Sequence, residues 1–330
     1  MPNKVISLVT GGAGFIGSHL VDLLIKKGHE VRVIDDLSGG HLENFKQHKN
    51  NKNFFFKKKN INNLSANEKF FNNVNYVFHL AGKGDIVPSI ENPTEYLSTN
   101  VIGTTKVLEN CRNKKLKKFV YAASSSCYGL ATTPTKESHK ISPQYPYALS
   151  KYLGEQVCFH WSKVYKIPVN SIRIFNAYGT RVKTTGVYGA VFGVFLKQKL
   201  SNRPLTIVGN GQQKRDFLYV TDVARAFYMV SQSKYKNSIY NLGAGKPEKI
   251  IKLAKMLGKE FVYLPKRPGE PHCTWADISK IKREIKWTPS ISFKHGVNKM
   301  LLNIKDWKNA PLWDDNSIKK ATNTWFKYLS

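Results

Sequence analysis

The sequence predicts an α/β fold built on a doubly wound parallel sheet, with a second, smaller α/β lobe. Three observations lead to this prediction. Short apolar runs alternate with helix-length amphipathic segments up to about residue 175. The first apolar run leads directly into a glycine-rich turn. The chain has 330 residues, 41% of them hydrophobic and 12% aromatic, which is enough to fill a large core. Strands that alternate with helices through short connections favour a parallel sheet.

The turn after the first expected strand has the glycine spacing of a dinucleotide-binding loop. Gly11 permits a tight strand-to-helix turn, and Gly14 lets the backbone approach a pyrophosphate. Gly17 allows the helix to pack closely on the sheet. Free N–H groups at the helix N-terminus favour phosphates there. Phe15 and Ile16 lie within this loop and are candidate cofactor contacts.

The second expected strand, over residues 31–34, ends in Asp35. A carboxylate about twenty residues after the glycine loop can accept hydrogen bonds from both hydroxyls of a ribose. Asp35 would repel a 2′-phosphate, and the neighbouring Asp36 adds to that repulsion. Strand, glycines, helix, second strand and acid agree in order and spacing. They predict a Rossmann-type domain that binds NAD rather than NADP.

The later part of the chain continues the alternation and then departs from it. After residue 176, prolines, aromatics and loops dominate, as expected of a lobe that covers the carboxyl ends of the strands, where ligands bind. We assign residues 1–176 plus about 218–243 to the NAD-binding domain and residues 177–217 plus 244–330 to the substrate lobe. Expected strands cover residues 5–9, 31–34, 75–81, 118–123 and 169–174, and expected helices 18–27, 93–113, 147–164, 191–200, 222–233 and 250–257.

Tyr147 and Lys151 form a candidate catalytic pair. They lie four residues apart on an expected helix and therefore share one face. An ammonium beside a phenol, with a cationic nicotinamide ring nearby, would lower the pKa of Tyr147 and make it a usable base. Alone, this spacing is more often a surface pair. Tyr145 is the nearby competitor, but Leu149 stands four residues after it.

A run of three serines, Ser124, Ser125 and Ser126, follows the expected strand over residues 118–123. The carboxyl ends of parallel strands lie at the edge of the sheet where the nucleotide is expected. A serine hydroxyl there can hydrogen-bond the alcohol or ketone oxygen of a substrate. The serine run therefore adds a candidate substrate contact to the pair on the following helix.

Together these features resemble the extended short-chain dehydrogenase/reductases, specifically the NAD-dependent nucleotide-sugar epimerases and dehydratases of the UDP-galactose 4-epimerase type. The resemblance covers nearly the whole chain. Its motifs lie at residues 10–17, 35–39, 79–82, 100–104, 124–129, 147–151, 173–179, 215–222 and 241–245.

The resemblance implies roles for individual residues. Tyr147 would be the catalytic base, Lys151 its pKa partner and a ligand of the nicotinamide ribose, and Ser124 the partner of the substrate oxygen. Further cofactor contacts would be Asn60, Ile61, Leu80, Ala81 and Asn100, with Asn60 standing where the family often has an Asp that contacts adenine. Substrate contacts would be Ser125, Ser126, Asn176, Ala190, Val191, Arg215, Arg267 and Thr274.

Among these substrate contacts, Asn176, Arg215, Arg267 and the backbone at Ala190 and Val191 would bind the diphosphate. Thr274 would stand at the position that limits sugar size. Its small side chain favours room for an N-acetylated sugar. The alternative that another residue sets sugar size stays open.

The serine run also bears on the reaction. Family dehydratases carry a Thr-Asp-Glu type triplet at this strand end, and the decarboxylases keep its Glu. Serines cannot supply that acid/base chemistry near pH 7. We therefore expect a 4-epimerase of a UDP-hexose or UDP-N-acetylhexosamine that acts through a transient 4-keto intermediate. A dehydratase, decarboxylase or reductase of the same family remains an alternative, as does a non-catalytic NAD-sensing protein.

The charge of the chain points to no particular partner. Lys plus Arg is 52 against 22 acidic residues, which gives a formal charge of +30, but only nine of the 52 are Arg. Lysines interleaved with asparagines indicate a solvated surface rather than a nucleic-acid interface.

The cysteines and the hydropathy pattern favour a cytoplasmic protein. The four cysteines lie far apart and predict neither a zinc site nor a disulfide framework, so no metal is expected. We expect no membrane insertion, because no apolar stretch reaches the roughly 18 residues of a span. The resemblance implies a homodimer through helices 93–113 and 147–164. The stretch 303–313, with Trp325 and Phe326, is either a packing tail or a subunit contact.

Overall fold

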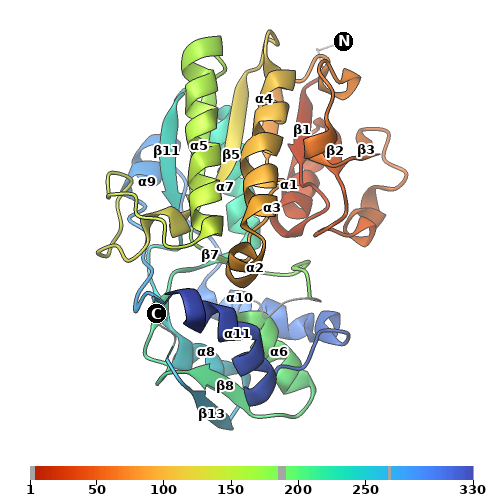
Figure 1. Cartoon of the computed structure of the whole chain (residues 1–330). Coiled ribbons are helices and arrows are strands. Elements are labelled where there is room, and N and C mark those ends of the chain that lie inside the picture. Colours follow the sequence, from red (N-terminus) through yellow and green to blue (C-terminus); the bar gives the residue numbers. More distant parts are fainter. Residues whose placement is uncertain (1–3, 185–190, 267–268, 330) are drawn as a thin grey trace.

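A seven-stranded parallel sheet organises the larger domain of the computed structural model, which describes residues 4–184, 191–266 and 269–329 (Figure 1). The strand order is β11-β6-β5-β4-β1-β2-β3, and every neighbouring pair is parallel. The order reverses between β1 and β4, so ligands are expected at the carboxyl ends of these two strands. The strands are β1 (Ile6–Thr10), β2 (Glu30–Asp35), β3 (Phe54–Lys58), β4 (Tyr76–His79), β5 (Lys118–Ser124), β6 (Val169–Ile174) and β11 (Ser238–Leu242).

Helices cover both faces of this sheet, and each face has its own core. On one face, α1 (Phe15–Lys26) and α7 (Val220–Gln232) pack together and bury side chains such as Leu20 and Phe227 against the strands. On the other face, α4 (Thr104–Cys111) and α5 (Pro146–Tyr165) bury Val107 and Cys158 (Figure 1). The predicted doubly wound α/β class is confirmed.

The helix expected over residues 93–113 is interrupted. It consists of α3 (Pro93–Leu97), a π-helical segment (Ser98–Gly103) and α4. A Cβ on Gly103 would lie 2.6 Å from Cδ1 of Ile61, so the wide turn packs tightly against the loop after β3. π-helical segments occur mostly as single turns inside α-helices, often at functional sites. Here the segment contains the buried Asn100.

Within the described ranges, the smaller lobe has its own core and three two-stranded sheets. They pair β7 (Asn176–Tyr178) with β10 (Phe217–Tyr219), β8 (Leu205–Val208) with β13 (Phe261–Leu264), and β9 (Lys214–Arg215) with β12 (Glu248–Lys249). The remaining α-helices are α2 (Ile86–Glu91), α6 (Val191–Leu200), α8 (Ile250–Leu257), α9 (Ser279–Ile285), α10 (Phe293–Leu302) and α11 (Asp315–Leu329). The 3₁₀ turns cover Leu42–His48, Ile61–Asn63, Lys69–Phe71, Ser125–Tyr128 and Ile304–Trp307.

One part of the expected substrate lobe packs elsewhere. Helix α9 lies beside β11 at the end of the large sheet (Figure 1). Its Ile281 and Ile285, with the following Trp287, belong to the core on the α1 and α7 face. Residues 276–287 therefore pack with the NAD-binding domain, whereas the sequence placed them in the lobe. The assignment of the other residue ranges to the NAD-binding domain and the substrate lobe remains a proposal.

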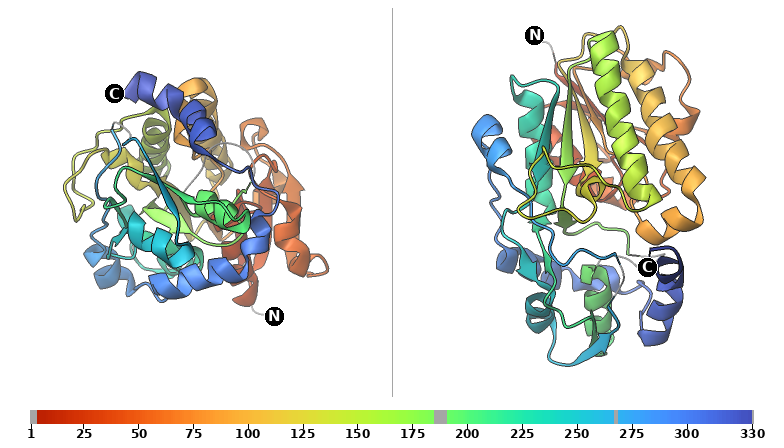
Figure 2. Two further views of the ribbon diagram at one scale, coloured as in Figure 1. Left: turned by 90° about the horizontal axis from the view of Figure 1, so that it is seen from below. Right: turned by 60° about the vertical axis from the view of Figure 1, so that its left-hand side comes forward.

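The C-terminal helix α11 packs at the junction of the two domains. Figure 2 shows it on the side of the lobe that faces the larger domain, close to α2. The Thr324 hydroxyl donates to Oε1 of Glu91 in α2 at 3.0 Å. Trp325 is 7% exposed, and its ring centroid lies 6.4 Å from that of Tyr145. The tail is thus packed against the rest of the same chain.

A buried ion pair fastens α5 to the sheet. Glu155 of α5 receives two hydrogen bonds from Arg173 of β6, from Nη2 at 2.5 Å and from Nε at 3.1 Å. Ser171 donates a third to the same carboxylate at 2.7 Å, and Arg173 Nη1 donates to the Tyr128 hydroxyl at 2.8 Å. Both charged side chains are almost fully buried. The register between the helix and strands β5 and β6 therefore depends on this pair.

We expect Glu155→Ala to reduce the free energy of unfolding by about 3–5 kcal/mol, because it leaves the Arg173 guanidinium buried without its carboxylate. Urea denaturation measures the change. Glu43→Ala is the control, since it removes an exposed ion pair with Lys46 that is worth about 0–1 kcal/mol. Equal losses in the two variants would contradict a stabilising role for the buried pair.

Candidate functional site

Two glycines where β1 leads into α1 have no room for a side chain: Gly11 in the loop and Gly17 in the first turn of α1. Gly11 has a φ of +70°, and a Cβ there would lie 2.5 Å from the backbone nitrogen of Ala81. A Cβ on Gly17 would lie 2.1 Å from the carbonyl oxygen of Gly11. Since Leu80 and Ala81 directly follow β4, the loop meets the neighbouring strand end. This close approach of backbones is what the glycine spacing predicted.

Asp35 at the end of β2 holds that loop in place. Its Oδ2 accepts the backbone N–H of Ala13 at 2.9 Å, and its Oδ1 accepts that of Leu37 at 2.8 Å. Each oxygen keeps a further lone pair, so the carboxylate can still accept from ribose hydroxyls. Burial raises the pKa of Asp35 above its usual range, and the two backbone N–H groups oppose this.

The other predicted cofactor contacts gather around the same sheet edge. Asn60, beyond β3, donates to Oδ2 of Asp36 at 2.7 Å, and Ile61 beside it is buried. Gly14 precedes α1, which begins at Phe15 and continues with Ile16. The structure therefore brings the predicted cofactor residues of the first three strands together.

Asn100 is a structural contact in this arrangement. Its side chain is 1% exposed. Its Oδ1 accepts the backbone N–H of Lys83 at 2.8 Å, and its Nδ2 donates to the Lys83 carbonyl and to the Ser150 hydroxyl. It ties the loop after β4 to α5, and it would influence a cofactor through that loop rather than by its own free groups.

Tyr147 and Ser124 face each other at the edge of the sheet. Tyr147 lies in the first turn of α5, and Ser124 ends β5. Burial raises the pKa of Tyr147 well above its usual range, and a hydrogen bond with Ser124 opposes this shift. Lys151 is 7% exposed, and burial lowers its pKa to about 8. Its Nζ lies 4.5 Å from the centroid of the Tyr121 ring.

In the protein alone the pKa of Tyr147 is therefore shifted upward, and the lowering expected beside a nicotinamide ring stays a prediction. Desolvation of the phenol is the dominant influence, and its direction is upward. The spacing of Tyr147 and Lys151 placed them on one helix face, but it carried no information about how deeply that face is buried.

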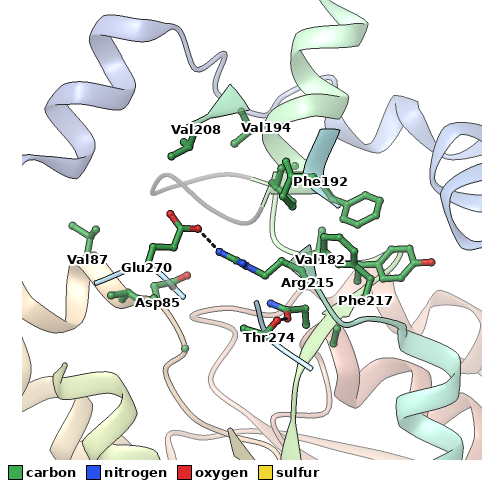
Figure 3. Close-up of a pocket in the computed structure, with 18 of the residues that line it drawn as sticks. Asp85, Val87, Val182, Phe192, Val194, Val208, Arg215, Phe217, Glu270 and Thr274 are labelled. Atoms are coloured by element: carbon green, nitrogen blue, oxygen red, sulfur yellow. Dashed lines mark hydrogen bonds and ion pairs between the residues drawn. The ribbon is translucent and has the colours of Figure 1, made fainter. Parts of the chain in front are cut away.

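A pocket of about 520 Å³ opens between the two domains beside Tyr147 (Figure 3). Its lining includes most of the predicted substrate contacts, namely Ser125, Ser126, Asn176, Val191, Arg215 and Thr274. Phe15 lines it as well, whereas Ser124 and Lys151 are not among its lining residues. Ala190 and Arg267 lie outside the described residues.

One wall of this pocket holds paired polar groups (Figure 3). Arg215 Nη2 donates to Oε1 of Glu270 at 2.5 Å, and its Nη1 donates to the carbonyl of Pro271 at 2.9 Å. The Thr274 hydroxyl donates to Oδ1 of Asn176 at 2.6 Å. Thr274, predicted to limit sugar size, is therefore hydrogen-bonded to Asn176, which is predicted to bind the diphosphate. A guanidinium and an amide on one wall suit the recognition of phosphate oxygens.

Sequence reasoning missed several residues of the pocket, among them Asp85 and Trp325. Asp85 lies between β4 and α2, and a carboxylate just beyond a strand end was a signal that could have identified it. Trp325 reaches the pocket from α11 and contacts Tyr145. No local pattern marks Trp325, because only tertiary packing brings α11 to this place.

Over residues 4–184, 191–266 and 269–329, no group of three or more His, Cys, Asp or Glu side chains is placed to hold a metal ion. Within the same ranges, no helix combines the length and the apolar character needed to cross a membrane.

We expect Gly17→Ala to reduce the free energy of unfolding by about 1–3 kcal/mol, because the new methyl group would overlap the backbone of the loop. Denaturant titration measures the loss, and NAD titration measures the damage to the loop. Gly39→Ala is the control, because a Cβ there has no atom within 4 Å. A neutral Gly17→Ala variant would show that the loop is not tightly packed.

The family model for GDP-mannose 4,6 dehydratase matches residues 8–300 of the chain. A putative UDP-glucose 4-epimerase of Methanocaldococcus jannaschii is 36% identical over 303 residues, which covers 89% of this chain and 96% of that protein.

Solved structures agree with this match. The UDP-glucuronic acid 4-epimerase of Bacillus cereus, in complex with UDP-glucuronic acid and NAD, has a TM-score of 0.85 at 32% identity, and the match covers 92% of this chain and 99% of that one. The UDP-N-acetylglucosamine 4-epimerase of Methanobrevibacter ruminantium, in complex with UDP-N-acetylmuramic acid, also has a TM-score of 0.85 at 32% identity, with 94% and 99% covered. The chain therefore belongs to the extended short-chain dehydrogenase/reductases, in the family of NAD-dependent nucleotide-sugar epimerases and dehydratases.

Proposed function

We propose that the protein is an NAD-dependent UDP-sugar 4-epimerase. The observation that carries this proposal is the contact between Tyr147 and Ser124 beside a pocket that Ser125 and Ser126 also line. A phenol and a hydroxyl can hold and deprotonate one alcohol. The serine run places no carboxylate beside that alcohol for a second proton transfer. Reversible oxidation of one carbon is the reaction that needs no more than this.

The residues around the β1 loop fit NAD. The close packing at Gly11 and Gly17 sets the N-terminus of α1 beside the strand ends, where a pyrophosphate would bind, and Asp35 retains lone pairs for a ribose. NAD would supply a hydride acceptor and a positive charge beside Tyr147. That charge acts against the burial that raises the Tyr147 pKa.

Individual side chains of the protein then have separate roles at the sugar. Ser124 orients the 4-hydroxyl, and Tyr147 takes its proton as C4 is oxidised to a ketone. Asn176 and Arg215 hold the diphosphate while the 4-keto sugar turns over in the pocket. Tyr147 returns the proton when C4 is reduced from the opposite face. No proton acceptor for C5 or C6 enters this sequence.

The first experiment incubates the purified protein with UDP-glucose, UDP-N-acetylglucosamine or UDP-glucuronate, without added cofactor, and follows products by proton NMR. We expect a mixture of C4 epimers that is reached from either side. A 4-keto-6-deoxy sugar or released CO₂ would instead identify a dehydratase or a decarboxylase. Consumption of one equivalent of added NADH would identify a reductase.

Tyr147→Phe is expected to lower kcat about 10²–10⁴-fold, because it removes the proton acceptor and keeps the ring. Turnover by proton NMR and the NAD content of the variant are the two readouts, and NAD content should not change. Tyr145→Phe is the matched comparison, since its ring stacks on that of Tyr147 at 6.3 Å. A larger loss of kcat in Tyr145→Phe than in Tyr147→Phe would identify Tyr145 as the base.

We also propose that the pocket accepts UDP-hexoses and UDP-N-acetylhexosamines. Support comes from Thr274, a small side chain that lines the pocket next to Asn176. A large residue there would project into the same space. This proposal keeps Thr274 as the residue that limits sugar size.

We expect Thr274→Tyr to lower kcat/KM for UDP-N-acetylglucosamine at least about tenfold more than for UDP-glucose, because the ring fills the space of the N-acetyl group. Thr274→Ser keeps the hydroxyl bonded to Asn176 and controls for that hydrogen bond. Equal losses for both sugars in Thr274→Tyr would leave sugar size to another residue.

A homodimer through α3, α4 and α5 is part of the proposal. Four large apolar side chains on these helices and the π-helical segment between them are exposed, namely Leu97, Ile102, Leu149 and Val164. An interface between two copies would cover such side chains. The cytoplasmic location expected from the sequence stays a prediction.

A further inference from the structure

A carboxylate that the proposed reaction does not use lies in the sugar pocket. Asp85 follows β4 and directly precedes α2, and it lines the same pocket as Tyr147. Figure 3 shows its side chain directed into the space that Arg215 and Glu270 face from the lobe. The side chain is exposed to this space rather than packed into the core.

Asp85 lies close to the reacting end of the pocket. Its charge is one of the influences that raise the pKa of Tyr147. The Tyr96 hydroxyl hydrogen-bonds the backbone of Asp85, and the Tyr96 ring meets that of Tyr147 edge-on at 6.4 Å. A sugar whose 4-hydroxyl reaches Tyr147 would therefore have other substituents near Asp85.

The positive groups nearest to Asp85 are committed elsewhere. Lys83 forms an ion pair with Glu95 at 2.6 Å, and Lys183 donates to the carbonyl of Ser38 at 3.1 Å. Across the pocket, Arg215 is paired with Glu270. Among the described residues, none forms an ion pair or a hydrogen bond with the Asp85 carboxylate. Both lysines lower its pKa only through space, against the burial that raises it.

An unpaired carboxylate in a partly desolvated pocket discriminates between sugars. A second carboxylate brought close to it is repelled more strongly than in water, because the effective dielectric constant is lower. A hydroxyl or amide N–H in the same place donates a charge-assisted hydrogen bond to it. The same side chain therefore penalises one class of sugar and favours another.

We propose that Asp85 is a specificity-determining residue that selects uncharged UDP-hexoses and UDP-N-acetylhexosamines and excludes UDP-uronates. This inference rests on the proposed function and adds a charge criterion to it. It separates this chain from the similar structure that contains UDP-glucuronic acid. Size, through Thr274, and charge, through Asp85, would then be set by different elements of the fold.

The test measures binding, so it does not depend on turnover. Isothermal titration of the enzyme with its NAD gives Kd values for UDP-glucose, UDP-glucuronate and UDP. We expect the wild type to bind UDP-glucose at least about tenfold more tightly than UDP-glucuronate. Asp85→Asn keeps the shape and removes the charge, and it should reduce that ratio at least about tenfold. UDP, which lacks the sugar, should bind equally to both proteins.

Glu109→Gln is the matched control, because it removes one negative charge from α4, outside the pocket lining, and its ion-pair partner Arg112 is not among the charges that act on Asp85. It should leave the ratio of the two Kd values unchanged. If Asp85→Asn loses UDP binding through misfolding, Asp85→Ser is measured in its place.

Two results would overturn the inference: a wild type that prefers UDP-glucuronate, or an unchanged ratio in the Asp85 variant. Either could occur in an active epimerase, so the proposed function would stand. Conversely, the protein could show the expected Kd ratios and yet epimerise none of UDP-glucose, UDP-N-acetylglucosamine and UDP-glucuronate. That result would contradict the proposed function and leave the role of Asp85 in binding intact.

Discussion

The ion pair between Glu155 and Arg173 is the constraint on which the geometry of the site depends. Helix α5 carries Tyr147 and Lys151, and β5 delivers Ser124, so the two elements must keep a fixed register. The pair, with the hydrogen bonds from Ser171 and to Tyr128, locks α5 to β6 and to the turn after β5. Burying two charges is costly, and apolar packing would suit stability as well. The pair instead fixes how α5 is aligned on β6, because the bidentate contact between Arg173 and Glu155 permits only one alignment of the two elements.

The predicted cofactor and substrate residues lie at strand ends that are remote in sequence. Parallel strands bring all their carboxyl ends to one edge, where β1, β2, β4 and β5 present the glycine loop, Asp35, Asp85 and Ser124. The lobe supplies the opposite wall of the pocket, with Arg215 and Thr274. Both domains provide polar groups, so neither domain alone contains the site.

The C-terminal segment extends this arrangement. The family match ends at residue 300, and the segment that follows it includes α11. This helix bonds to α2 through Thr324 and Glu91, and it sets Trp325 against Tyr145 in the pocket. Since Asp85 directly precedes α2, the helix that carries Trp325 also supports the loop that carries Asp85.

Local patterns predicted five strands of the large sheet, though not β3 and β11, together with the glycine loop and the positions of Asp35, Ser124, Tyr147 and Lys151. These follow from local rules: alternating apolar runs, glycine spacing and a four-residue helical repeat. The depth at which Tyr147 is buried depends on tertiary packing, because residues from many parts of the chain surround the phenol. This burial sets the upward direction of the Tyr147 pKa. The tertiary structure also decided that Asp85 and Trp325, 240 positions apart, line one pocket, because no local pattern encodes a contact between distant segments.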